Sequence, residues 1–224
     1  MPVNIAMDGP VGAGKSTIAD EVAKRLGILH LDTGAMYRAL GVAALDRGLD
    51  VNDEEAVTNL CQTIHMDVTH EQGGQHTLVD GEDLTSRLRT EQASMAASKV
   101  ATYPGVRAEM VRSQQRLARS HAMLVDGRDI GTRVLPKATL KIFITASPEV
   151  RAKRRFLQLK ESGKLGDTTF EQVLSDLLAR DDQDMHRETD PLRRAEDAVL
   201  VDTSEMDFEA SVEALLALAK ERRA

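Results

Sequence analysis

The stretch VNIAMDGPVGAGKST, residues 3–17, decides the fold. Its first half is a mostly apolar run that ends in Asp8-Gly9-Pro10, a pattern typical of a buried strand that enters a loop. Apolar residues then recur every fourth position from Ile18 to Leu26, and Gly27 stands where a helix C-cap is expected. We therefore predict that the chain opens with a strand, a glycine-rich loop and a helix over about residues 14–26.

The loop Gly9–Ser16 matches the pattern G-x-x-x-x-G-K-[ST] in full, between a strand and a helix, which is the context that gives the pattern its meaning. Glycines let successive backbone N–H groups approach phosphate oxygens, and the helix N-terminus adds partial positive charge. Lys15 can then reach the β- and γ-phosphates of ATP, and the Ser16 hydroxyl can bind Mg²⁺. The predicted nucleotide site consists of Gly9, Pro10, Val11, Gly12, Ala13, Gly14, Lys15, Ser16 and Thr17.

The composition limits the classes of protein to consider. The 224 residues, 42% of them hydrophobic, suffice for one domain with insertions. Lys and Arg number 29 against 36 Asp and Glu, and the net charge of -7 argues against a protein that coats nucleic acid. Cys61 is the only cysteine, no secretory leader is evident, and no apolar run approaches the ~18 residues of a membrane helix. We expect a cytoplasmic protein that binds neither nucleic acid nor membrane.

Further apolar runs occupy residues 122–125, 140–144 and 198–201, and each ends in turn-forming residues. A helical pattern is expected after each run, which favours an α/β fold with a parallel sheet flanked by helices. The sequence between about residues 51 and 103 differs: we predict a helix near Glu54–Ile64, followed by a small antiparallel hairpin.

The hairpin strands are predicted at Met66–Thr69 and Gln75–Val79, around Gly73-Gly74. A third region, Glu149–Arg187, has a helical pattern that is broken near Gly163 and Gly166 and is rich in Arg and Lys. We therefore expect a small insert and a helical segment beside the parallel sheet.

Three segments contain both arginine and aspartate: Asp32–Arg38, Asp126–Arg133 and Arg180–Arg187. Taken alone, each segment has a simpler explanation. The first could be a helix start capped by Thr33, the second a weak surface ion pair and the third a solvated helix face. The second segment, however, follows a predicted core strand, at the carboxyl edge where open α/β sheets bind ligands. Arginine offers bidentate donors to phosphate, and carboxylates accept from hydroxyl or amino groups, so a second anionic substrate is expected.

Together with the Gly9–Ser16 loop, Val106–Glu109 and Ala195–Ala198, these segments resemble the nucleoside monophosphate kinases, specifically the bacterial-type cytidylate kinase family, over essentially the whole chain. The resemblance implies a single P-loop kinase domain, residues 1–224, with an NMP-binding insert at about 38–106 and a helical lid at about 151–187. It also implies a monomer that transfers a phosphoryl group from ATP to CMP or dCMP and requires Mg²⁺.

The resemblance also implies roles for individual residues. The cytosine-reading set is Thr33, Ser98, Arg107, Asp129 and Arg187, the acceptor-phosphate ligands are Arg38 and Arg128, and the ribose ligands are Arg180 and Asp184. Lys15, Arg128 and Arg180 are the expected catalytic residues, and Ser16 is the expected Mg²⁺ ligand. Arg151, Arg154 and Arg155 resemble the start of the lid, although each would also suit a solvated helix face. Ser is frequent in the family at the position of Thr33, and some relatives have Gly at that of Ser16.

Two alternatives follow from the phosphate loop alone. A kinase of another small acceptor would share the loop, and a panel of acceptors would separate it. A nucleotide-binding switch would also share the loop, but the chain has no guanine-reading Asn-Lys-x-Asp segment, and its arginines suit a second anion.

Overall fold

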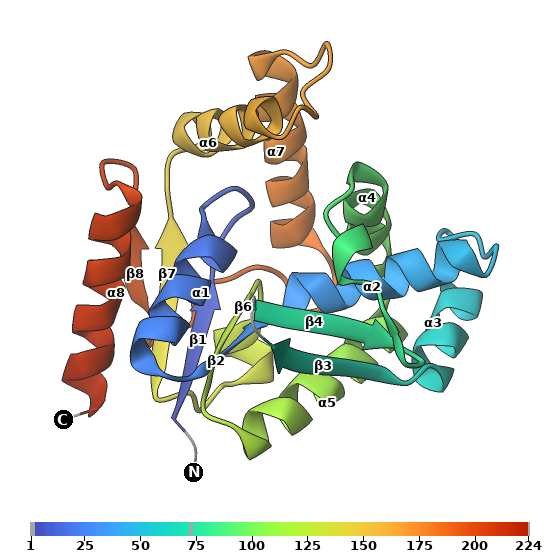
Figure 1. Ribbon diagram of the computed structural model, residues 1–224, viewed down its shortest axis with the longest axis horizontal. Helices are drawn as coiled ribbons and strands as arrows, with labels where there is room; N and C mark the ends of the chain where they lie inside the picture. Colours follow the sequence, from blue (N-terminus) through green and yellow to red (C-terminus); the bar gives the residue numbers. More distant parts are fainter. Residues whose placement is uncertain (1–2, 72–73, 224) are drawn as a thin grey trace.

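The computed structural model describes residues 3–71 and 74–223; the predicted turn residue Gly73 lies outside them. A five-stranded parallel sheet with the order β2-β6-β1-β7-β8 forms the centre (Figure 1). Its strands are β1 (Asn4–Asp8), β2 (Leu29–Asp32), β6 (Met123–Gly127), β7 (Leu140–Thr145) and β8 (Val199–Asp202). The predicted α/β class with a parallel sheet is confirmed.

Alternation along β1 explains why helices cover both faces of the sheet. Ile5 and Met7 are buried in one cluster with residues of α1 (Lys15–Leu26) and α8 (Phe208–Arg223). Ala6, between them, lies in a second cluster with residues of α2 (Thr33–Asp46) and α5 (Pro104–Ser120). Successive side chains of a strand point to opposite faces, so a strand buried on both faces reads as a continuous apolar run.

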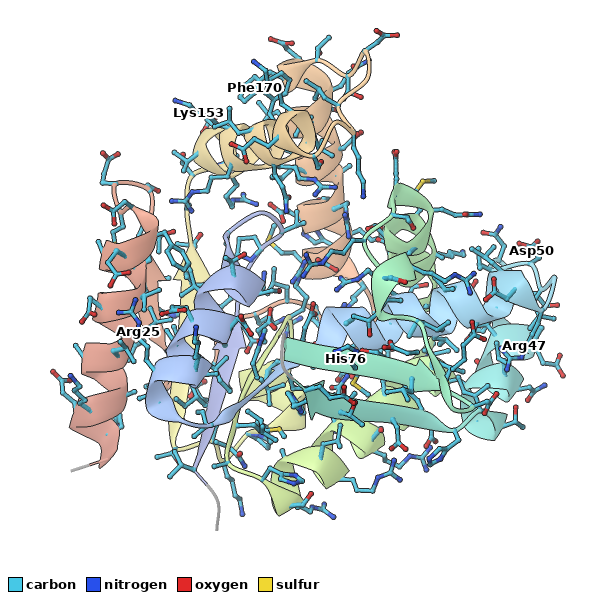
Figure 2. All side chains as sticks on the ribbon, viewed as in Figure 1. Arg25, Arg47, Asp50, His76, Lys153 and Phe170 are labelled. Carbon is cyan, nitrogen blue, oxygen red and sulfur yellow. The ribbon has the colours of Figure 1, made fainter. Side chains whose placement is uncertain are left out.

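Polar contacts also tie α1 to α8. Arg25, near the end of α1, bonds to Glu209 and Glu213 of α8, and Figure 2 shows Arg25 between the two helices. The predicted C-cap Gly27 ends α1 with φ 65°, the left-handed conformation that glycine adopts without strain.

The predicted insert lies beside the parallel sheet (Figure 1). It contains α3 (Glu54–Thr63), β3 (Met66–Glu71), β4 (Gly74–Val79), β5 (Glu82–Asp83), the 3₁₀ turn η1 (Thr85–Arg87) and α4 (Glu91–Val100). Strands β3, β4 and β5 pair antiparallel, as predicted for the first two. The Gln75 amide bonds to both the backbone N–H and the carbonyl of Asp32, so a side chain of β4 occupies the free edge of β2.

Two helices, α6 (Pro148–Glu161) and α7 (Phe170–His186), lie above the carboxyl ends of the strands (Figure 1). Figure 2 labels Lys153, within α6, and Phe170, the first residue of α7. Phe156 and Phe170 pack edge to face, with ring centroids 6.2 Å apart. The break between the helices falls at residues 162–169, where Gly163 and Gly166 were expected to interrupt the helical pattern.

One expectation for the core is wrong. After β6, the structure has only one turn of π-helix, η2 (Ile130–Val134), before the chain enters β7. The backbone N–H groups of Ile130 and Gly131 bond instead to the buried carboxylate of Asp8, which holds this turn against the sheet edge. No helix within residues 3–71 and 74–223 is long and apolar enough to cross a membrane.

Candidate active site

The glycine-rich loop connects β1 to α1 at the carboxyl edge of the sheet. Gly9 approaches β7 so closely that a Cβ atom on it would lie 2.0 Å from the carbonyl oxygen of Ile144. Gly12 and Gly14 have φ values of 75° and 83°, which residues with a side chain rarely adopt. The loop therefore needs its glycines, and it ends at the N-terminus of α1, where backbone N–H groups can bind an anion.

The Lys15 side chain is buried and folds back across the loop. Its Nζ donates to the carbonyl oxygens of Gly9 (2.8 Å) and Pro10 (2.7 Å). Burial, followed by the positive charge of Arg128, lowers the pKa of Lys15 to about 7. A phosphate beside Lys15 would favour the charged form, so this site suits an anionic ligand.

Ser16 and Asp126 bring oxygen ligands together beside the loop. Ser16 Oγ donates to Asp126 Oδ2 (2.9 Å), and His30 Nε2 lies 2.8 Å from Asp126 Oδ1. Burial favours a higher pKa for Asp126, but the His30 bond, the charges of His30 and Lys15 and the Ser16 bond outweigh it, so the pKa lies below its usual value. Within the described ranges, no three His, Cys, Asp or Glu residues form a metal cluster. The residues present fit Mg²⁺, which is commonly held by one or two protein ligands together with phosphate oxygens.

Several arginines converge near Lys15. Arg128 Nε donates to Asp184 (2.7 Å), and Arg38 Nη2 donates to Asp32 (2.7 Å). Burial, together with the nearby charge of Arg128, lowers the pKa of Arg180. Within residues 3–71 and 74–223, the buried Nε of Arg38 has no hydrogen-bond partner. Buried donors are ordinarily satisfied, so this orphaned group favours a ligand at this position.

Thr33 does not cap α2. The Asp32 side chain accepts from the N–H of Ala35 and is the N-cap, whereas Thr33 is the first residue of the helix. Because Asp32 already provides the cap, the Thr33 hydroxyl donates to the carbonyl of Asp126 in the neighbouring strand (2.8 Å). Gly34 and Arg38 lie on one side of the helix, since a Cβ atom on Gly34 would lie 3.0 Å from Arg38 Nη1.

Three of the five residues expected to read cytosine form a buried network. Arg107 Nη2 donates to Asp129 Oδ2 (2.5 Å), and Arg187 Nη2 lies 3.4 Å from Asp129 Oδ1. The Arg107 guanidinium also lies over the ring of Tyr37, 5.8 Å from its centroid. Ser98 stands apart from these charges and exchanges two hydrogen bonds with Gln183 of α7. The structure thus brings Arg107, Asp129 and Arg187 into direct contact.

Two of the three arginines on α6 do not lie on a solvated helix face, which was the alternative to a role at the start of a lid. Arg151 is buried and paired with Asp181 of α7, and Arg154 donates to the hydroxyl and carbonyl of Thr203, after β8. Arg155 instead bonds to Gln158 one turn along its own helix. Two of the three arginines therefore hold α6 in place.

Sequence reasoning missed Asp8, Asp181, Gln183 and Asp190. Asp8 could have been noticed as an acidic residue at the end of an apolar run, directly before the glycine loop. Asp181 and Gln183 belong to the Arg180–Arg187 segment but had no role assigned. Nothing in the local pattern indicates Asp190, because its partners are distant in sequence.

A separate groove of ≈ 660 Å³ opens between α2 and α4, lined by residues that include Leu45, Val51 and Met95. It lies away from the charged network, so we do not place a substrate there. The fold and site define an enzyme of the P-loop kinase class, with a phosphate loop beside a cluster of arginines at the carboxyl edge of a parallel sheet.

Comparison with known proteins gives the particular family. The family model described as cytidylate kinase matches residues 5–221, and the chain belongs to this family. Cytidylate kinase of Caldicellulosiruptor saccharolyticus is 46% identical over 96% of this chain and 95% of its own length. Cytidylate kinase of a Geobacillus species is 43% identical over 98% of this chain and 97% of its own length. A shikimate kinase structure from Bacteroides thetaiotaomicron matches with a TM-score of 0.50 and 13% identity, over 97% of this chain and 98% of that one, and supports the fold alone.

Proposed function

We propose that this enzyme transfers the γ-phosphoryl group of ATP to CMP or dCMP, giving ADP and CDP or dCDP. Membership of the cytidylate kinase family supports the reaction. The observation that carries the substrate assignment is the buried network of Arg107, Asp129 and Arg187. It adjoins Arg128, whose charge acts on Lys15 of the phosphate loop, so a base-reading site and a phosphate site meet at one sheet edge.

The donor nucleotide occupies the loop from Gly9 to Thr17. Lys15 exchanges its bonds to the Gly9 and Pro10 carbonyls for phosphate oxygens, and backbone N–H groups at the start of α1 hold the remaining oxygens. Ser16 would hold Mg²⁺ through its hydroxyl, and Asp126, which accepts from Ser16, would lie beside the ion. When bound, Mg²⁺ neutralises charge on the phosphates.

The acceptor lies beside α2 and α7, which carry Arg38 and Arg180. Arg38 and Arg128 bind the acceptor phosphate, for which the unpartnered Nε of Arg38 in the described part of the chain is one supporting observation. Arg180 and Asp184, one turn apart on α7, bind the ribose, and Arg180 also meets the transferred group. Thr33, Ser98, Arg107, Asp129 and Arg187 surround the base.

Transfer is direct and in line. A non-bridging oxygen of the CMP phosphate forms a bond to the γ-phosphorus as the bond from that phosphorus to the β,γ-bridging oxygen breaks. The electron pair of the broken bond leaves on ADP. Because the attacking phosphate is already negative, no strong base is needed, and Lys15, Arg128 and Arg180 stabilise the charge of the transition state.

We further propose that residues 1–224 act as one domain, with an insert at about 38–106 and a lid at about 151–187. Two contacts support a closed arrangement: Gln183 with Ser98, and Lys164 Nζ with the carbonyl of Arg89 (2.8 Å). Closure of these parts would exclude water from the transferred group. The enzyme acts as a cytoplasmic monomer, without nucleic acid as a partner.

The test is ADP release from Mg-ATP with CMP, dCMP, UMP, AMP and GMP offered separately to the wild type and to Arg187→Ala. We expect the wild type to turn over chiefly CMP and dCMP. In Arg187→Ala, we expect a smaller difference in turnover between these two acceptors and the other three. Strong turnover with a different acceptor would overturn the substrate assignment. A preference left intact in Arg187→Ala would overturn the base-reading role of this residue.

A further inference from the structure

We propose that Asp190 is a specificity-determining positioning residue, which fixes the two arginines that read the base. The inference rests on the base-reading function proposed above for Arg107 and Arg187. Asp190 lies beyond the end of α7, in the loop that leads to β8. It uses two different groups, its carboxylate and its backbone carbonyl, on two different arginines.

The contacts of Asp190 converge on the base-reading network. Its Oδ2 accepts from Arg107 Nε (3.3 Å), and its Oδ1 lies 3.5 Å from Arg133 Nε. Its backbone carbonyl accepts from Arg187 Nε (2.8 Å) and also from Arg187 Nη2. One residue therefore sets the positions of both guanidinium groups.

The backbone of Asp190 makes this double contact possible. Its φ of 48° lies in the left-handed region, where Asp and Asn occur more often than other residues with a side chain. The next turn is anchored, because the N–H of buried Leu192 bonds to the carbonyl of Asp184 (2.8 Å). A sparsely populated conformation persists when its surroundings determine it, and such residues cluster at functional sites.

The contact matters because Arg107 is buried, with a side chain 1% exposed. Its Nη2 bonds to Asp129, its Nη1 to the carbonyl of Ala101 (3.3 Å) and its Nε to Asp190. A guanidinium group has its donors in one fixed plane, so three partners on three nitrogens fix that plane. Without the carboxylate of Asp190, the Nε of Arg107 would turn toward Asp129, its remaining carboxylate partner.

This rearrangement would change what Asp129 offers to a base. While Asp190 holds Nε, Asp129 bonds to one Nη nitrogen of Arg107, and among residues 3–71 and 74–223 its Oδ1 has only the long 3.4 Å contact with Arg187. That oxygen can accept from the amino group of cytosine, whereas uracil has a carbonyl at this position and would be repelled. Specificity depends on such a difference in affinity between two ligands. If both carboxylate oxygens of Asp129 bonded to Arg107, neither would be available to distinguish cytosine from uracil.

The experiment is steady-state kinetics of Asp190→Asn with CMP and UMP as acceptors. Asn tolerates the left-handed conformation and keeps the backbone carbonyl bonds to Arg187, so the change is confined to the side chain, which loses its negative charge and exchanges one acceptor oxygen for an NH₂ donor. We expect the ratio of kcat/KM for CMP to that for UMP to fall by about tenfold. The KM for CMP should rise more than kcat falls, and the KM for ATP should not change. Asp190→Gly, which also suits a positive φ, provides a second variant and should show the same pattern.

The matched control is Asp46→Asn, which removes the partner of Arg87 in an exposed ion pair and should leave both acceptors unaffected. A CMP to UMP ratio within about twofold of the wild type in both Asp190 variants would overturn the inference, as would an equal rise in the KM values for ATP and CMP. The Arg187→Ala variant distinguishes a failure of the proposed base-reading function from a failure of the role of Asp190. If it leaves acceptor preference intact, the base-reading function itself fails; if it blurs preference and the Asp190 variants do not, only the role of Asp190 fails.

Discussion

Arg151 and Asp181 form a buried ion pair, Nη1 to Oδ2 2.5 Å, and both side chains also bind the same residue of the phosphate loop. Arg151 Nη1 donates to the carbonyl of Val11 (2.9 Å), and Asp181 Oδ1 accepts from the N–H of Val11 (3.1 Å). Arg151 belongs to α6 and Asp181 to α7, so both of these helices are tied to the loop. Because α7 also carries Arg180 and Asp184, this pair aligns the proposed acceptor ligands with the donor loop.

We expect Asp181→Asn to destabilise the enzyme by about 3–5 kcal/mol, because the change leaves Arg151 as an unpaired buried charge. The two side chains are only 5% and 4% exposed, so water cannot replace the lost carboxylate. The measurement is the free energy of unfolding in urea. Asp46→Asn breaks an exposed ion pair with Arg87 and should change the free energy of unfolding little. Equal effects of the two substitutions would contradict the structural role of the Arg151 pair.

The fold was predictable where local pattern and tertiary structure agree. The strand, loop and helix of residues 4–26 depend on apolar period and on glycines that only this turn requires, and all are visible in the sequence. The hairpin of β3 and β4 was predicted for the same reason. The single turn η2 was not, because the hydrogen bonds that it needs come from Asp8, more than a hundred residues earlier.

The site was predictable in part for a related reason. Asp32 and Thr33 are both good helix caps, and sequence alone does not decide which side chain accepts from Ala35. Arg151 has the sequence context of a solvated helix face, and its burial depends on Asp181, thirty positions further along. Asp190 depends on a left-handed backbone and on distant arginines. Long-range partners decide these roles, and a single sequence does not contain them.

The Mg²⁺ requirement can be tested at Ser16. We expect EDTA to abolish transfer, and Ser16→Ala to raise the Mg²⁺ concentration needed for half-maximal activity several-fold, because the hydroxyl next to Asp126 is lost. Ser16→Thr keeps the hydroxyl and should restore the wild-type dependence. The readout is initial rate against free Mg²⁺ at fixed ATP. An unchanged Mg²⁺ dependence in the Ala variant would remove Ser16 from the metal site.

The packing of α2 on α4 gives a test of the insert. A Cβ atom on Gly41 would lie 2.7 Å from the Cβ of Ala96, so Gly41→Ala forces apart the helices that carry Arg38 and Ser98. Overpacking costs about 1–3 kcal/mol, which exceeds the ~1 kcal/mol that Ala gains over Gly within a helix. We expect lower stability and a raised KM for CMP with little change in the KM for ATP.

The matched control for this packing is the double variant Gly41→Ala with Ala96→Gly. It moves the methyl group from one helix to the other, so the 2.7 Å contact disappears, and only close contacts of 3.3 Å with the backbone of Ala96 and Ala97 remain. The helix propensities of the two changes nearly cancel. Thermal unfolding and acceptor KM should both return toward wild-type values. A double variant as impaired as Gly41→Ala alone would show that the contact between the two Cβ atoms is not the cause.

Asp8 provides a test by pH. Its buried carboxylate accepts from the N–H groups of Ile130 and Gly131, each at 2.7 Å, and burial raises its pKa to about 6. The pKa of Asp in an unfolded chain is about 3.9. Between about pH 4 and pH 6, the folded enzyme therefore keeps a proton that the unfolded chain releases. The contribution of Asp8 to stability is greatest below about pH 4, and it is lost as pH rises through 6.

Asp8→Asn, which does not titrate, is the reference for measuring this effect. We expect the free energy of unfolding of the wild type, minus that of the variant, to fall by on the order of 3 kcal/mol between pH 4 and pH 7, since each pKa unit corresponds to about 1.4 kcal/mol. Urea unfolding at several pH values gives both quantities, and subtraction cancels the other titrating groups. A difference that stays constant would mean an unshifted pKa for Asp8. A difference that grows with pH would mean that the two N–H donors outweigh burial and lower the pKa.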